Sequence, residues 1–302
     1  MSRGVGVAEF LTELPTAVVV GFAVITQLGD FWFVSTASVL AYWLGSATPV
    51  VGRGLSRERA AMVVGLVVTA AAVTLTLKSI FAFPRPPADE IVAAAAGLPW
   101  PVRPFYESVV TGRGYGFPSG HATTAVLVWG GFAWALRVGR ARQRYAVAGA
   151  VVAVISLARL VLGVHYLIDV VVGTTIATAV LWVALAKLRT PTRLFAFTTV
   201  VAAVGVAVGG LTRDTAGAVG LAVGGLLTMW ALDGMPAPTR RGGAATAVLG
   251  AVSLGTLAAV IVHLTPPDVV VGVLAAVGMG MVLALPLVGE RVAEKSGRGN
   301  GS

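Results

Sequence analysis

Long apolar runs dominate this 302-residue chain and limit what it can fold into. Hydrophobic residues make up 57% of the sequence and charged residues only 12%. A soluble domain carries about 25% charged residues, which help to cover its surface with groups that face water. Most of this surface must therefore face lipid. Because a backbone in lipid has to satisfy its own hydrogen bonds, the runs are predicted to be membrane-spanning helices.

Ten apolar runs follow one another, separated by short polar segments. They cover about residues 15–28, 31–51, 60–81, 119–137, 145–162, 165–187, 194–211, 215–232, 244–264 and 268–288. The sequence therefore predicts an all-α polytopic bundle of about ten transmembrane helices. We expect a six-helix core in residues 1–190, four further helices of unknown role in residues 191–289 and a disordered charged tail in residues 290–302.

The positive charge of the chain is concentrated in alternate loops. The formal net charge is +9, and most Arg and Lys lie in the tail and in the loops 52–59, 137–144, 187–193 and 233–243. Cytoplasmic loops of membrane proteins carry such an excess, so we expect these loops and both termini to be cytoplasmic. A nucleic-acid partner is not expected, because the cations are scattered through short loops instead of gathered on one face.

Three polar clusters interrupt the apolar pattern between Lys78 and Asp169. The first begins at Lys78 and ends in Arg85-Pro86, the second is Pro118-Ser119-Gly120-His121, and the third contains Arg159, His165 and Asp169. Counting spans puts all three at the same membrane face, opposite the Arg-rich loops. The set suits a bound phosphate, because arginine and lysine bind phosphate oxygens and a helix N-terminus such as the one expected at Ser119 attracts anions.

These clusters, in this order, resemble the signature of the type 2 phosphatidic acid phosphatase superfamily, which shares its helical core with bacterial acid phosphatases and vanadium haloperoxidases. The family pattern is K-x6-RP, then PSGH, then SR-x5-H-x3-D. The first two motifs match in full, and the third has Ala158 in place of the usual serine. The resemblance covers roughly residues 15–190 and implies that residues 1–190 form a lipid phosphatase-like domain.

The resemblance also implies a role for each polar residue. His165 would attack phosphorus to form a phosphohistidine, Asp169 would orient His165, and His121 would protonate the leaving oxygen. The phosphate oxygens would be held by Lys78, Arg85, Arg159, Ser119 and the N–H of Gly120. No metal or cofactor is implied. The expected substrate is a lipid phosphate or polyprenyl diphosphate, cleaved on the extracytoplasmic face of the cell membrane.

Other interpretations stay open for single residues. Lys78 and Arg159 can also be explained as span-end cations that extend to the interface, and His165 with Asp169 as a structural pair at a helix start. Asp89, Glu90 and Glu107 are better explained as solvated loop charges than as metal ligands, and His263 as an interfacial residue. The segment 82–117 is interpreted as a lid over the site.

Alternatives also remain for the whole chain. It could be an inactive phospholipid-binding or transport protein on the same scaffold, or a phosphotransferase to another alcohol. A vanadate-dependent haloperoxidase is disfavoured, because those members of the superfamily are soluble. The spacings Gly205/Gly209 and Gly220/Gly224 permit close helix approach and leave dimerisation as a minor alternative.

Overall fold

The computed structural model describes residues 15–48, 54–87, 98–100, 102–111, 114–232 and 234–298. Within these ranges the chain is helical with no strand, which confirms the all-α bundle. The helices are α2 (Thr16–Ile25), η1 (Thr26–Gly29), α3 (Phe31–Leu44), η2 (Gly45–Ala47), α4 (Arg57–Phe81), α6 (Val102–Val110), α7 (Gly120–Ala135), α8 (Ala141–Val161), α9 (Leu167–Val183), η4 (Ala184–Leu188), α10 (Pro191–Gly209), α11 (Arg213–Ala231), α12 (Arg240–His263) and α13 (Asp268–Arg298).

Short polar side chains start many of these helices. Asp30 accepts a hydrogen bond from the N–H of Trp32 at the start of α3, and the hydroxyls of Ser56, Thr190 and Thr239 do the same at α4, α10 and α12. Such caps satisfy N–H groups that have no partner inside the helix. The segments between the apolar runs therefore encode where each helix begins.

The first two apolar runs do not form two separate spans. Residues 17–29 and 31–44 form a pair of helices bent by 45° at Asp30, as in a broken span or a re-entrant loop. Six of the described helices are long and apolar enough to cross a membrane, or seven if this pair is one span. The prediction of about ten spans exceeds that number, in part because α7 is only 16 residues long.

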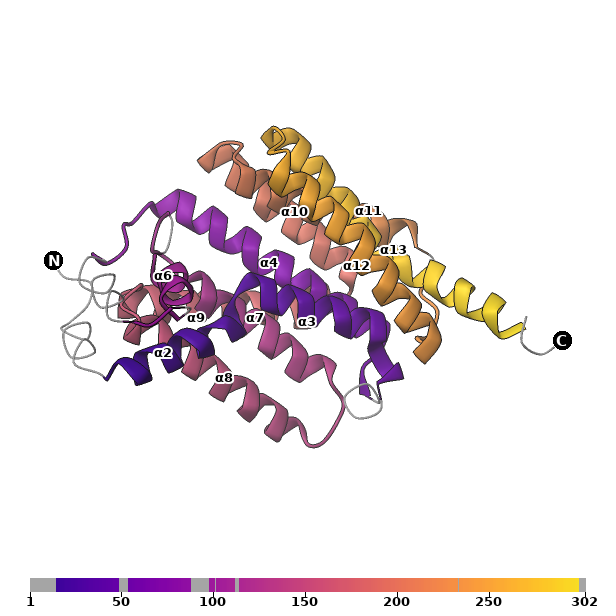
Figure 1. Ribbon diagram of the computed structural model, residues 1–302, viewed down its shortest axis with the longest axis horizontal. Coiled ribbons are helices and arrows are strands. Elements are labelled where there is room, and N and C mark those ends of the chain that lie inside the picture. Colours follow the sequence, from indigo (N-terminus) through magenta and orange to yellow (C-terminus); the bar gives the residue numbers. More distant parts are fainter. Residues whose placement is uncertain are drawn as a thin grey trace.

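Helix α4 lies at the centre of the bundle. It contacts α3, α7, α10 and α11, and 78% of its most apolar stretch is buried. Figure 1 shows α10 to α13 along one side of α4 and α7 to α9 along the other. The helix that carries Lys78 in its last turn is therefore packed on both sides.

The last four helices share a core with the first six. One buried cluster joins Val63 and Val67 of α4 to Phe195 of α10 and to Met279 and Leu283 of α13. The Tyr42 hydroxyl and the Trp43 indole N–H donate to the carbonyls of Leu283 and Val282, both at 2.8 Å. Hydrophobic packing thus runs across the boundary expected at residue 190.

Both glycine pairs are used for helix packing within the chain. A Cβ at Gly205 or Gly209 would collide with Thr76 or Ser79 of α4. A Cβ at Gly220 or Gly224 would collide with the backbone of α13 at Gly272 or Ala276. The spacing therefore accounts for contacts inside the monomer, and dimerisation is not needed to explain it.

The C-terminal tail was predicted to be disordered, and this prediction is wrong for its first part. Helix α13 continues through Glu290 to Arg298, and Glu290 is only 5% exposed. Its carboxylate is 3.3 Å from the guanidinium of Arg57 and accepts hydrogen bonds from the N–H and hydroxyl of Thr239. Composition suggested a solvated tail, but these partners give the carboxylate a buried position. Residues 299–302 lie outside the described ranges.

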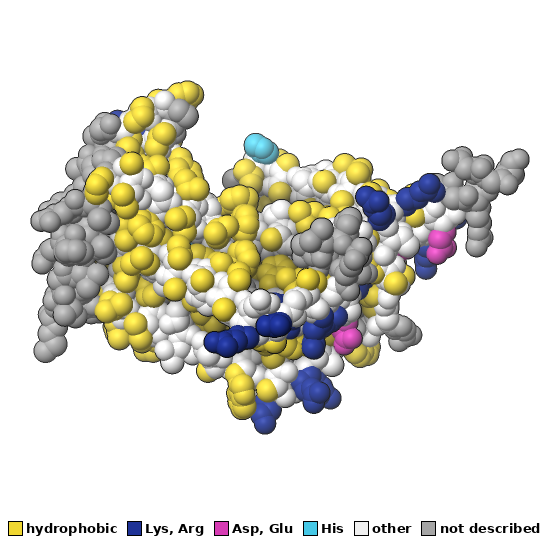
Figure 2. Space-filling view, turned by 90° about the horizontal axis from the view of Figure 1, so that it is seen from below, with side chains coloured by type: hydrophobic (Ala, Val, Ile, Leu, Met, Phe, Trp, Pro, Cys, Tyr) yellow, Lys and Arg dark blue, Asp and Glu magenta, His cyan; other side chains and the backbone are white. Residues whose placement is uncertain are grey.

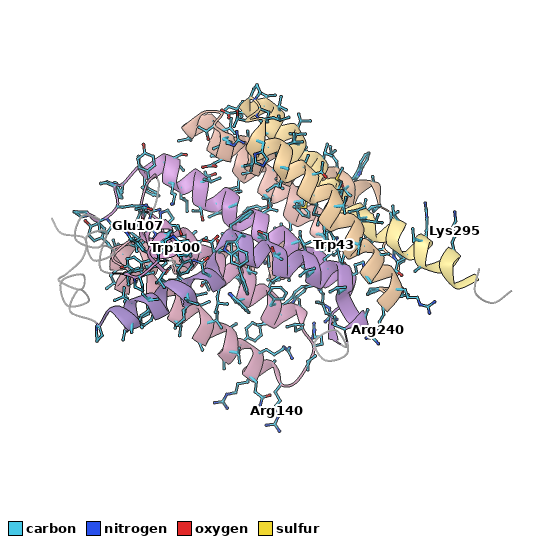
Figure 3. All side chains as sticks on the ribbon, viewed as in Figure 1. Trp43, Trp100, Glu107, Arg140, Arg240 and Lys295 are labelled. Atoms are coloured by element: carbon cyan, nitrogen blue, oxygen red, sulfur yellow. The ribbon has the colours of Figure 1, made fainter. Side chains whose placement is uncertain are left out.

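The two ends of the bundle differ in charge. The Arg-rich loops meet at one end, where Arg137 N–H donates to Gly54 O and Arg57 donates to Pro236 O. Figure 3 shows Arg140, Arg240 and Lys295 at this end and Trp100 and Glu107 at the other. In the face seen in Figure 2, Lys and Arg side chains gather toward one part of the surface and hydrophobic side chains cover much of the rest.

Candidate active site

A cavity of about 650 Å³ lies at the end of the bundle away from the Arg-rich loops. It brings together six of the eight site residues predicted from the sequence. Its lining consists of Gln27, Asp30, Trp32, Lys78, Arg85, Ser108, Val109, Thr111, Gly120, His121, Arg159 and His165. Ser119 and Asp169 are fully buried behind this lining.

Lys78 and Arg85 come from the end of α4 and the segment that follows it. Lys78 lies in the last turn of α4, and Ala82, the residue after this helix, has the left-handed conformation (φ 49°). The chain then turns so that Arg85 Nη1 donates to Val164 O at 3.2 Å and lies 3.3 Å from His165 Nε2. The spacing of the first motif thus puts Lys78 on the helix and lets Arg85 reach His165.

His165 lies in the turn between α8 and α9. Its Nε2 faces Arg85 and the cavity, while its Nδ1 is 3.5 Å from Asp169 Oδ2. Burial lowers the pKa of the His165 imidazole well below its ordinary value, and the nearby cations, Arg159 first, lower it further. The ring is therefore neutral at neutral pH. A carboxylate on the Nδ1 side favours the tautomer whose lone pair is on Nε2, 3.3 Å from Arg85 Nη1.

Asp169 has a second contact besides His165. Its Oδ2 accepts a hydrogen bond from the N–H of Tyr166 at 3.0 Å, so it also caps α9. The backbone carbonyl of Asp169 accepts from the N–H of Ser119, which ties the start of α9 to the start of α7. The structural role at a helix start is therefore present, and the catalytic role of Asp169 stays a prediction.

The PSGH motif forms the start of α7. The hydroxyl of Ser119 faces the N–H of Ala122 at 3.5 Å, which makes it the cap of this helix. Gly120 and His121 follow in the first turn and line the cavity. A Cβ at Gly120 would lie 3.1 Å from Thr74, so little room exists there for a side chain. The positive end of the α7 dipole points at the cavity.

Arg159 lies in the last turn of α8 and is only 3% exposed. Its Nη1 donates to the hydroxyl of Thr26 at 3.1 Å. Its Nε–H has no hydrogen-bond partner among the described residues. A buried guanidinium with an unused donor at the edge of a cavity is suited to binding an anion.

Asp30 is a site residue that sequence reasoning missed. Its Oδ2 is 3.5 Å from His121 Nε2, across the break between η1 and α3. In the sequence it is part of a Gly-Asp pair between the first two apolar runs and lies outside the three motifs. The one available signal was a lone carboxylate at the edge of two membrane segments.

Part of the segment interpreted as a lid lines the cavity. Helix α6 contacts α2, and Ser108, Val109 and Thr111 at its end line the cavity. Glu107 pairs with Arg103 at 2.8 Å, and Asp89 and Glu90 lie outside the described residues.

This arrangement can bind a small multivalent anion and act on it. Three cations from separate elements line one cavity, and their mutual repulsion is relieved when an anion binds between them. The neutral imidazole of His165 faces the space between these cations, and His121 lies at the start of α7. A nucleophile, an acid and fixed positive charge are the parts that phosphoryl transfer requires.

Comparison with known proteins supports this description. Residues 59–193, which include all eight predicted site residues, match the family model described as the PAP2 superfamily. Neither curated proteins nor solved structures gave a significant match to the chain.

Proposed function

Residues 59–193 belong to the PAP2 superfamily, and we propose that this multi-pass membrane protein is a phosphatase that hydrolyses a lipid phosphate or polyprenyl diphosphate. The observation that carries the proposal is the convergence of Lys78, Arg85 and Arg159 with two histidines on one cavity. The catalytic part lies in residues 1–190, and α10 and α11 pack against its central helix α4.

The proposed reaction proceeds in two steps. In the first, His165 Nε2 attacks phosphorus, the bond from phosphorus to the leaving oxygen breaks, and His121 gives that oxygen a proton. In the second, water attacks the phosphohistidine, His121 takes a proton from the water, and inorganic phosphate leaves. Asp169 stabilises the positive charge on His165, while Lys78, Arg85, Arg159 and the N–H of Gly120 bind the non-bridging oxygens. Ser119 contributes by capping the helix that carries Gly120 and His121.

An apolar groove beside the site supports a lipid substrate. It has a volume of about 730 Å³ and runs between α3, α4, α11, α12 and α13. Phe31 lines this groove, and Trp32, the next residue, lines the polar cavity. We propose that the substrate's phosphate binds in the cavity and its hydrocarbon chain in the groove.

This proposal is tested with purified protein on a panel of long-chain lipid phosphates, polyprenyl diphosphates and their short-chain analogues. We expect phosphate release from the long-chain substrates. Gly255→Phe fills the groove, because Gly255 lines it and has open space around its Cα. The variant should raise KM for a long-chain substrate roughly tenfold, equivalent to about 1.4 kcal/mol of lost contacts.

Gly149→Phe is the matched control, because Gly149 lies on the exposed face of α8 with no atom near its Cβ position. This variant should leave KM unchanged for both long-chain and short-chain substrates. An equal rise in KM for short-chain and long-chain substrates in Gly255→Phe would argue against the groove as the tail site. Absence of phosphate release from every substrate would contradict the phosphatase function itself.

We also propose that the active site faces outward across the cell membrane, because the Arg-rich loops gather at the opposite end. Single cysteines can test this, since the chain has none. Ser108 and Gln143 are exposed at opposite ends of the bundle. A thiol reagent that cannot cross the membrane should label Ser108→Cys in intact cells and should label Gln143→Cys only after lysis. The reverse pattern would put the active site in the cytoplasm.

A further inference from the structure

The site contains two pairs of histidine and carboxylate, and only one of them lies within the sequence motifs. His165 faces Asp169 four residues away, whereas His121 faces Asp30, which is 91 positions earlier in the chain. Both distances between ring nitrogen and carboxylate oxygen are 3.5 Å. The two pairs share this distance but use different ring nitrogens, since Asp30 faces Nε2 of His121 and Asp169 faces Nδ1 of His165.

The backbone around Asp30 is held firmly against the site. Thr26 accepts a hydrogen bond from Arg159, and Leu28 O accepts one from the indole N–H of Trp129 at 3.0 Å. A Cβ at Gly29 would lie 2.9 Å from Ile155 and 3.4 Å from the carbonyl of His121, so only glycine lets this turn approach so closely. The break in the first span thus holds a carboxylate against the start of α7.

The Asp30 carboxylate offsets the positive charges that surround His121. Lys78, Arg85 and Arg159 line the same cavity as His121, and each of them disfavours a positive charge on the ring. A general acid must nevertheless carry a proton on a nitrogen that reaches the leaving oxygen. Asp30 is half-buried beside the ring and supplies the opposite charge.

We propose that Asp30 is a positioning residue, which orients the His121 imidazole and stabilises its protonated form while His121 acts as the general acid. This inference rests on the proposed phosphatase function. Asp30 acts through His121 and not on the phosphate itself, so its contribution should depend on how strongly the leaving oxygen needs a proton.

Asp30→Asn is the most selective test, because asparagine caps a helix as well as aspartate does and so should preserve the start of α3. The test compares kcat/KM, which covers only the steps up to departure of the leaving group, because His121 also takes a proton from water in the second step. On a short-chain phosphatidate, whose alkoxide is strongly basic, we expect kcat/KM to fall roughly 10–100-fold. On p-nitrophenyl phosphate, whose leaving group departs without a proton, we expect a loss of less than about threefold.

His121→Ala should show the same dependence on the leaving group, and adding Asp30→Asn to it should cause no further loss. Glu58→Gln removes an exposed carboxylate at the other end of α4 and should match the unaltered protein. Equal losses on both substrates in Asp30→Asn, or additive losses in the double variant, would overturn the inference while leaving the phosphatase function intact. An unaltered protein that is inactive on both substrates would overturn the proposed function and this inference with it.

Discussion

Replacement of His165 by alanine is expected to abolish the phosphoenzyme on every substrate. The reason is geometric, since Nε2 of His165 faces the cavity beside Arg85 while its other nitrogen faces Asp169. Loss of a nucleophile removes the first chemical step whatever the leaving group. A fall in kcat on the order of 10⁴-fold or more is expected, as in other enzymes that lose the nucleophile of a covalent mechanism. The measurement is acid-quenched incorporation of labelled phosphate, together with steady-state turnover.

Two controls make this result interpretable. His263→Ala changes the exposed histidine at the end of α12 and should have no effect. Binding of inorganic phosphate to the His165→Ala protein should persist, because the three cations of the cavity remain. If labelled phosphate is still trapped in His165→Ala, another residue is the nucleophile and the assignment is wrong.

The parts of the site that sequence could predict are those encoded locally. Lys78 with Arg85, the PSGH motif, and His165 with Asp169 each lie within a few residues of one another, so they can be read from the sequence as motifs that resemble those of a family. The expected alternation of spans then puts the three clusters at one end of the bundle. The structure brings six of these eight residues to one cavity, with Ser119 and Asp169 behind it.

The break at Asp30 could not be predicted from the same pattern, although its cause is physical. The first apolar run covers 14 residues, from 15 to 28, which as a helix reaches about 21 Å and falls short of the ~30 Å hydrocarbon core. It therefore continues into the next run as one bent pair. The contact between Asp30 and the start of α7 depends on packing between segments that are far apart in the sequence. No local spacing of residues encodes this contact.

The association of the last four helices with the core could not be predicted from the sequence either. Glycine spacing indicated that these helices approach something closely, but it did not identify the partner as α4 or α13. Composition likewise favoured disorder at Glu290, because a charged Gly/Ser-rich stretch has little apolar surface to bury. The structure gives Glu290 a buried position because Arg57 and Thr239 supply its partners.

The buried pair of Arg57 and Glu290 leads to the second prediction, because it joins α4 to α13 at the end of the bundle away from the site. The two side chains are 3% and 7% exposed. Arg57 also donates to the carbonyls of Trp43 and Pro236, so its charge stays buried when the carboxylate is removed. Removing one partner of a buried pair typically costs about 3–5 kcal/mol.

We therefore expect Glu290→Ala to lower the free energy of unfolding by about 3–5 kcal/mol. This is a large part of the about 5–15 kcal/mol that stabilises a typical native protein. Unfolding in detergent, followed by circular dichroism, measures this change. Glu107→Ala is the matched control, since its pair with Arg103 is solvent-exposed and an exposed pair of this spacing is worth only about 0.3–0.5 kcal/mol. A double-mutant cycle with Arg57→Ala should return a coupling energy, because the lone guanidinium is what makes Glu290→Ala costly. Similar small losses for Glu290→Ala and Glu107→Ala would mean that the carboxylate at 290 is not buried in solution, and that the last four helices are held to α4 by apolar packing alone.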